Sequence, residues 1–186
     1  PQAVPLLLLL SRALERQGTV DLAGERFAEA LKASNYNPQI TLDYTSFLGR
    51  RGRSEEIETT LTEALKRSPS NVLLLRALAK VRLDKQDWIG AQAAADALKK
   101  AGDASSVTKE ITGALLLGQK KYEESIATLE DAYANTPENA RPVYALFTAY
   151  ARAGKLDEAE TFLQSILTVN PKNADALALL GTLREM

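Results

Sequence analysis

The chain has 186 residues, of which 45% are hydrophobic and 25% are charged, and its net charge is −1 at pH 7. These proportions are typical of a soluble, well-packed protein and exclude a largely disordered chain. The balanced charge gives no overall attraction to nucleic acid or to an anionic membrane surface. The chain has neither cysteine nor histidine, so a disulfide, a thiol nucleophile, a zinc site or a Ser-His-Asp triad cannot be built from it.

The chain begins with an apolar run, Leu6 to Leu10, that could be mistaken for the core of a signal peptide. No basic segment precedes this run, and the residues after it continue with helical spacing. The run is also too short to cross a membrane. We therefore expect a first helix here and no membrane insertion of this segment. The chain starts at Pro1 rather than at a methionine, which indicates a piece of a longer protein.

From this helix onward, apolar residues recur at three- and four-residue spacing, the period of an amphipathic helix. Gly18, Gly52 and Gly154 interrupt pairs of such segments, at points where a helix can end in a left-handed residue. Prolines or Asp103 separate one pair from the next. The predicted helices cover residues 4–17, 20–33, 38–51, 54–67, 71–85, 87–101, 105–118, 121–135, 139–153, 155–168 and 173–185.

The breaks between pairs recur at a regular interval, with a period of about 34 residues. Pro137 and Pro171 are one such period apart, Pro69 lies two periods before Pro137, and Asp103 occupies the position between them. A fixed period of this size is the mark of a repeat protein built from stacked helix pairs.

Each unit also repeats one order of large and small residues. The fifth unit has Val143, Leu146 and Tyr150 in its first helix, then Ala159 and Leu163 in its second, with a proline after it. The corresponding residues of the earlier units are Leu7, Leu10, Leu14, Ala23 and Phe27; Thr41, Tyr44, Leu48, Ile57 and Leu61; Leu75, Leu78, Ala91 and Ala95; and Lys109, Thr112, Leu116, Ser125 and Leu129. In this spacing the chain resembles the tetratricopeptide repeat (TPR) family over essentially its whole length.

The resemblance implies an all-α fold of about eleven helices, in antiparallel pairs that stack into a right-handed superhelix. It implies one array over residues 1–186, with repeats at 4–37, 38–71, 72–105, 106–139 and 140–173 and a partial repeat at 174–186. It also implies that the first helices line a concave groove that holds a partner protein or peptide, with no cofactor and no catalysis.

Charge is divided unequally between the two kinds of helix. The predicted first helices of the five full units carry eleven Lys or Arg and four acids, a net charge of +7. Arginine pairs carboxylates with two hydrogen bonds, so we expect the groove to bind an acidic segment of a partner. The alternative is that these bases are solvated or pair with acids of the neighbouring unit. The predicted groove contacts are Arg12, Arg16, Ser46, Arg50, Arg76, Lys80, Glu110, Arg141, Tyr144, Thr148 and Arg152.

Some TPR domains clamp a partner's terminal carboxylate with a fixed set of Lys and Asn residues. Residues such as Leu8, Arg12 and Asp43 occupy the corresponding positions here, so this chaperone-type role is not transferred. Tyr122 begins a second helix, where we expect it to pack between helices.

The sequence leaves three other interpretations. A repeat that reads RNA one base per unit would need a regular polar code, and one equivalent position holds Leu8, Leu42, Arg76, Glu110 and Tyr144. The acidic pI of about 5.7 also argues against RNA.

The segment could instead be a non-catalytic region of a larger enzyme or of an envelope export protein. Its Asn-Pro-x-Asn turns are similar to those of bacterial TPR proteins, some of which serve exopolysaccharide and protein-sorting systems, and this similarity slightly favours the periplasm over the cytoplasm.

The two ends of the chain lack the polar surfaces that normally terminate a repeat array. Leu6, Leu8 and Leu9 cannot all face inward from one helix, and Leu177 and Leu183 lie in a last helix that has no partner helix. We therefore expect further repeats on both sides in a longer protein, or self-association into a homo-oligomer.

Overall fold

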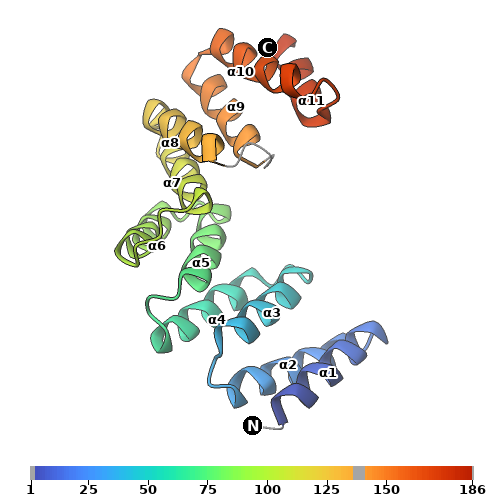
Figure 1. The fold of residues 1–186 in the computed structure, drawn as a ribbon. Helices are drawn as coiled ribbons and strands as arrows, with labels where there is room; N and C mark the ends of the chain where they lie inside the picture. Colours follow the sequence, from blue (N-terminus) through green and yellow to red (C-terminus); the bar gives the residue numbers. More distant parts are fainter. Residues whose placement is uncertain (1–2, 136–140, 186) are drawn as a thin grey trace. The chain divides into compact units, whose positions relative to one another are not determined.

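The computed structural model describes residues 3–135 and 141–185, which form eleven α-helices and no β-strand (Figure 1). The helices are α1 (Ala3–Arg16), α2 (Val20–Ala33), α3 (Pro38–Gly49), α4 (Ser54–Arg67), α5 (Val72–Asp84), α6 (Trp88–Lys100), α7 (Ser106–Gly118), α8 (Tyr122–Asn135), α9 (Arg141–Ala153), α10 (Leu156–Val169) and α11 (Ala174–Arg184). The all-α prediction is confirmed, and the predicted helix ends that fall within the described residues differ from the observed ones by at most two residues. The predicted helix start at residue 139 lies outside the described residues. The predicted break at Pro137 lies outside the described residues.

The chain forms two compact units, Pro1–Gly102 with helices α1 to α6 and Asp103–Met186 with helices α7 to α11. Within each unit every helix contacts the next one along the chain. We refer to Pro1–Gly102 as unit 1 and to Asp103–Met186 as unit 2. The repeat boundaries and the single continuous array stay predictions. None of the helices in the described ranges is long and apolar enough to cross a membrane.

Small residues lie where the two helices of a pair meet. Ala23, Ala91, Ser125 and Ala159 occupy one repeat position and are all fully buried. In unit 2 the two helices also approach closely at Gly113, where a Cβ atom would lie 2.5 Å from the side chain of Leu129. Bulk at these positions would push the helix axes apart, so the short side chains set the spacing of these four pairs, whereas the α3–α4 pair has the half-buried Ile57 at this position.

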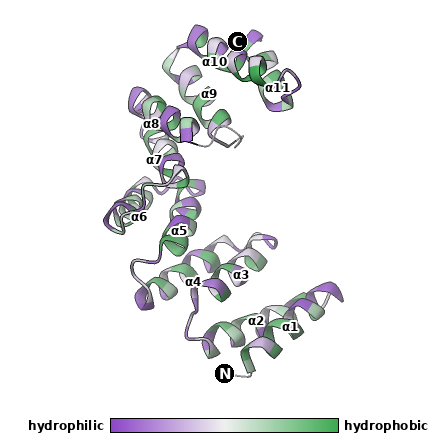
Figure 2. Ribbon diagram, viewed as in Figure 1, coloured by the Kyte–Doolittle hydropathy of each residue, from purple (hydrophilic) through white to green (hydrophobic). Residues whose placement is uncertain are grey.

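Large apolar residues fill the space between pairs. In unit 1 the rings of Phe27, Tyr44 and Phe47 pack together, with 5.2 Å between the ring centres of the two phenylalanines. In unit 2 Leu129 and Leu146 are fully buried in the main cluster. Figure 2 shows hydrophobic and hydrophilic residues on each helix, as expected for helices that are buried on one side only.

The turn inside each pair contains one residue with left-handed backbone. Gly18, Gly52 and Gly154 have φ of 81°, 68° and 74°, while the equivalent Gln86 and Lys120 have φ of 58° and 62°. This conformation suits glycine and disfavours residues with a Cβ. The sequence pattern therefore located the turns through three of the five positions, and the backbone is the same at the other two.

Turns with the sequence Pro-x-Asn supply helix caps. The side-chain oxygens of Asn71 and Asn173 accept hydrogen bonds from the backbone N–H groups of Leu74 and Ala176, at 3.1 and 2.9 Å. These bonds satisfy donors that the first turn of a helix leaves unpaired, so each cap marks the start of a first helix.

Of the leucines expected to be uncovered at the two ends, three are exposed, whereas Leu8 and Leu183 are half-buried against the clusters of their units. Leu6 and Leu9 are each 67% exposed on α1, and Leu177 is 49% exposed on α11. One helix cannot direct all its leucines to the same partner, so these side chains remain on the surface of their own unit.

Candidate functional site

The first helices of successive pairs form one face of each unit. In unit 1 α3 contacts α5, and in unit 2 α9 contacts both α7 and α11. Second helices of successive pairs make no such contacts in the described part of either unit. The predicted contact residues on first helices therefore share a face with their neighbours within a unit, and we call this the first-helix face.

Two of the predicted arginines in unit 1 are paired with acids of the adjacent first helix. Arg50 follows the end of α3, and its guanidinium donates to the two carboxylate oxygens of Glu15 on α1 at 2.9 and 3.1 Å. Arg12 on α1 donates to Asp43 on α3 at 3.2 Å. For Arg12 and Arg50, the structure shows the alternative to ligand binding, an ion pair with an acid of the neighbouring repeat.

Other first-helix bases pair with second helices. The Glu58 carboxylate on α4 accepts from Lys85 at 2.8 Å and from Arg82 on α5 at 3.0 Å, and these bonds lower the pKa of Glu58. Lys109 on α7 lies 2.6 Å from Asp131 on α8 and lowers the pKa of that carboxyl. Much of the basic charge counted from the sequence thus stabilises contacts between helices.

The remaining predicted residues of unit 1 and Glu110 of unit 2 differ in exposure. Arg16 and Lys80 are exposed, and neither forms an ion pair with any residue in 3–135 or 141–185. Ser46 is also exposed, whereas Arg76 and Glu110 are half-buried. Of the predicted contact bases in unit 1, Arg16 and Lys80 are therefore the ones that a ligand can reach without displacing an ion pair among the described residues.

In unit 2 the predicted contacts lie along α9. Tyr144 is 48% exposed. The Thr148 hydroxyl donates a 2.8 Å hydrogen bond to the backbone carbonyl of Tyr144, so the hydroxyl proton of Thr148 is already used within the helix. Arg152, near the end of α9, is exposed. The side chain of Arg141 lies outside the described residues.

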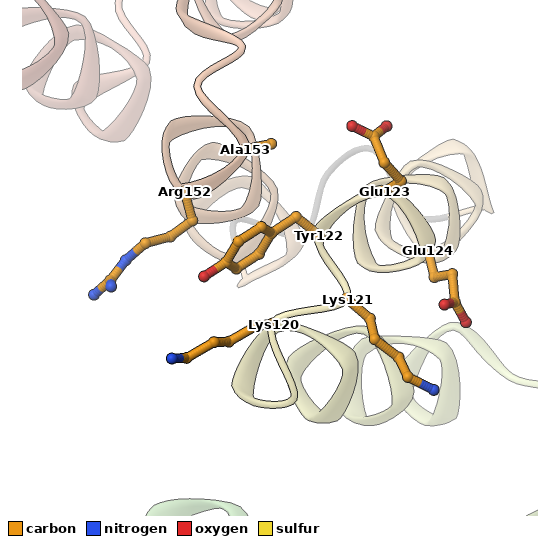
Figure 3. Close-up of a pocket in the computed structure, with 7 residues that line it drawn as sticks. All are labelled: Lys120, Lys121, Tyr122, Glu123, Glu124, Arg152 and Ala153. Carbon is orange, nitrogen blue, oxygen red and sulfur yellow. The ribbon is translucent and has the colours of Figure 1, made fainter.

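Arg152 borders an open hollow of about 380 Å³ between the α7–α8 turn and the end of α9 (Figure 3). We call this the turn hollow; it is lined by Lys120, Lys121, Tyr122, Glu123, Glu124, Arg152 and Ala153. Figure 3 shows Lys120, Tyr122 and Arg152 extending to the same side, while Lys121 and Glu124 extend to the opposite side. The two groups of side chains thus present separate surfaces.

Glu123 has its own partner outside this group. Its carboxylate lies 2.6 Å from the ammonium of Lys155, and their hydrogen bond raises the pKa of that lysine. By contrast, Lys120, Tyr122 and Arg152 have no ion pair or side-chain hydrogen bond within the described parts of the chain. The arrangement leaves two positive charges and one hydroxyl available to an anionic group.

Arg152 was predicted from the sequence as a groove contact, whereas Lys120 was not predicted as a site residue. The available signal was a lysine at the turn position where Gly18, Gly52 and Gly154 stand in other repeats. Tyr122 was predicted to pack between helices, and its half-buried ring also lines the hollow.

The chemistry that these surfaces can perform is recognition by charge and hydrogen bonding. Among the described residues, no three acidic side chains lie together where they could hold a metal ion. The exposed groups are guanidinium, ammonium, hydroxyl and aromatic side chains, which suit the binding of carboxylates and peptide surfaces.

A family model described as tetratricopeptide repeat matches residues 116–183. The TPR repeat-containing protein YpiA of Bacillus subtilis (strain 168) is 23% identical over 175 residues, which make up 94% of this chain. The chain spans 41% of the length of YpiA.

Solved structures of TPR proteins share the fold. A TPR protein from Parabacteroides merdae has a TM-score of 0.80 at 19% identity, covering 98% of this chain and 71% of its own. YrrB, described as a TPR protein with an unusual peptide-binding site, has a TM-score of 0.65 at 17% identity, covering 87% of this chain and 84% of its own. The predicted TPR solenoid fold is confirmed; the suggested envelope role stays a prediction.

Proposed function

Because the chain belongs to the tetratricopeptide repeat family, we propose that it is a protein-interaction scaffold whose first-helix face binds an acidic segment of a partner protein or peptide. The TPR fold supports the scaffold role, since stacked helix pairs offer an extended surface rather than a catalytic cleft. The peptide-binding site named for YrrB is a property of that protein, and its fold is shared here.

The observation that carries the acidic-segment proposal is the set of exposed first-helix bases without acid partners among the described residues. In unit 1 these are Arg16 and Lys80, and in unit 2 the set includes Arg152. Tyr144 adds a 48% exposed ring on the same face of unit 2, and exposed aromatic and arginine side chains are frequent anchors of interfaces. An acidic peptide would add hydrogen bonds to these groups without breaking the ion pairs of Arg12 and Arg50.

The proposal is tested with a fluorescent peptide of ten glutamates, blocked at both ends, and a matched peptide of ten glutamines. Anisotropy at low salt is expected to show binding of the glutamate peptide only, and rising salt is expected to weaken it through screening. Arg16→Glu/Lys80→Glu is expected to lower the affinity about tenfold, because each change replaces an attraction by a repulsion.

Lys99→Glu is the matched control, since Lys99 is an exposed base on the second helix α6. It changes the net charge in the same direction on a helix outside the first-helix face. Equal loss of affinity in Lys99→Glu and in a single Lys80→Glu variant would show that only the overall charge matters, and the first-helix proposal would be wrong.

Exposed leucines favour a second, self-associating mode. We propose that α1 can pack against another copy of the chain through Leu6 and Leu9, each 67% exposed. Size-exclusion chromatography with light scattering is expected to show a concentration-dependent increase in mass that Leu6→Lys/Leu9→Lys abolishes. Ile89→Lys, at an 87% exposed site on α6, is the control, and a strict monomer at high concentration would refute this mode.

A further inference from the structure

The repeats of this chain provide an internal comparison for the turn hollow. Residues that are three repeat periods apart occupy equivalent positions. By this count Arg152 is equivalent to Arg50, Leu117 to Glu15, and Lys120 to Gly18. The arginine is therefore the same in both places, while its surroundings differ.

In unit 1 the arginine at this position already holds a carboxylate. Arg50 Nε and Nη2 donate to Glu15 Oε1 at 3.1 and 2.9 Å, and Nη2 also donates to Oε2 at 3.1 Å. This is a forked pairing, the strongest geometry that a guanidinium forms with a carboxylate. The Arg50–Glu15 pair thus shows which group an arginine at this repeat position binds.

In unit 2 the internal carboxylate is missing. Leu117 stands where Glu15 stands in the first repeat, and its half-buried side chain packs against the apolar cluster of unit 2. Lys120 replaces Gly18 and brings a second positive charge to the hollow, although its left-handed φ of 62° disfavours a residue with a Cβ. Two changes in one repeat therefore remove an acid and add a base at the same place.

We propose that Arg152, Lys120 and the Tyr122 hydroxyl form a site that binds a side-chain carboxylate of an acidic peptide from solution, in place of the internal carboxylate of the first repeat. This inference rests on the proposed function and names one anchor point for it. The volume of about 380 Å³ is sufficient for one aspartate or glutamate side chain, because small-ligand pockets begin at roughly 300 Å³. Lys121 and Glu124, which extend to the other side in Figure 3, do not belong to the site.

The left-handed backbone of Lys120 makes a clean experiment possible. Lys120→Gly removes the ammonium group and places the residue that this φ favours, so a loss of binding cannot be caused by unfolding. Lys121→Gln removes a neighbouring base that lines the same hollow but points away from the proposed site. Tyr122→Phe removes only the hydroxyl.

The readout is the Nε–Hε resonance of Arg152 in ¹⁵N NMR spectra, assigned with Arg152→Lys and titrated with the blocked ten-glutamate peptide. The resonance is expected to shift and to saturate. Lys120→Gly is expected to weaken this binding about tenfold, the effect of one charge-assisted hydrogen bond, and Tyr122→Phe about threefold. Lys121→Gln is expected to change the affinity less than about twofold, as for an exposed charge.

Three results would overturn the site. If the Arg152 resonance stays fixed while the peptide binds through Arg16 and Lys80, the turn hollow is not an anchor and the wider proposal still stands. If Lys120→Gly and Lys121→Gln weaken binding equally, the hollow acts only through its general charge. If the peptide does not bind at all, both the site and the proposed function are wrong.

Discussion

The hydroxyl of Ser125 on α8 donates a 2.8 Å hydrogen bond to the backbone carbonyl of Gly113 on α7, and both residues are buried. A side chain reaches the backbone of a neighbouring helix only if the two helices lie very close. The approach is possible because Gly113 has no Cβ and Ser125 is small. This contact explains why short residues stand at both positions in the α7–α8 pair.

Gly113→Ala is expected to destabilise the protein by about 1 to 3 kcal/mol, because the new Cβ would overlap Leu129. The overlap outweighs the gain of up to about 1 kcal/mol in helix propensity. Urea unfolding, followed by circular dichroism, measures the difference. Gly181→Ala is the matched control, since Gly181 occupies the equivalent position of α11 and a Cβ there meets nothing within 4 Å. It is expected to be neutral or stabilising, and equal effects at both sites would contradict the account of Gly113.

The left-handed turn residues predict a gain in stability. Gln86→Gly and Lys120→Gly are each expected to stabilise their unit by about 1 kcal/mol, because glycine adopts a positive φ without the Cβ clash. Gly154→Ala, at φ of 74°, is expected to destabilise by a similar amount. Urea unfolding of the three variants tests the pattern, which fails if Gly154→Ala is as stable as the parent chain.

Tyr150 predicts a loss of stability at alkaline pH. Its hydroxyl donates to Glu130 at 2.5 Å, and burial, followed by this bond, raises the pKa of the phenol. A raised pKa means that the folded state favours the protonated form, so this stabilisation is present below about pH 10, the ordinary tyrosine pKa, and declines as the pH rises above it. Tyr150→Phe is expected to lower the free energy of unfolding by about 1 kcal/mol at pH 7. Between about pH 9 and 11, the free energy of unfolding of the variant is expected to decline less steeply with rising pH than that of the parent chain. Parallel pH profiles for parent and variant would contradict this.

Glu58 predicts the opposite dependence, at acidic pH. The bonds from Lys85 and Arg82 lower its pKa, so the charged form is favoured in the folded state. Its contribution is present above the ordinary glutamate pKa and is lost as the pH falls through the lower, folded value. Glu58→Gln is therefore expected to be less stable than the parent at pH 7, with a difference that shrinks as the pH falls below about 4.

Glu55→Gln is the control for this prediction. Glu55 also pairs with Lys85, at 2.9 Å, but its side chain is 90% exposed. Because exposed pairs are screened by solvent, the variant is expected to unfold almost as the parent does at both pH values. A larger effect at Glu55 than at Glu58 would show that burial does not govern this network.

The loop between α2 and α3 shows what local patterns did not reveal. Asn35 and Tyr36 both have left-handed backbone, with φ of 53° and 57°. The Tyr36 ring lies under the guanidinium of Arg67, which is 4.2 Å from the ring centre and also donates to Asn35 at 3.0 Å. Arg67 lies at the end of α4, far from this loop in the sequence, so only the folded chain brings these partners together.

The sequence by itself determined the helices, the turns and the family, because these depend on local spacing. A period of about 3.6 residues decides which side of a helix is buried, and short residues such as Gly113 and Ser125 mark where helices meet. A longer period, of about 34 residues, then identifies the repeat. The same spacing identified Arg50 and Arg152 as equivalent, and both were therefore predicted to bind an acidic partner.

Only the tertiary structure decided that the two arginines differ. Arg50 is held by Glu15, which belongs to another repeat, whereas Arg152 has no acid partner among the described residues and shares its hollow with Lys120. The sequence gives the charge of each side chain. Its ion-pair partner depends on distances of a few ångströms between helices that are far apart along the chain. Electrostatic attraction in water falls quickly with distance and exposure, so pairing had to be seen in three dimensions.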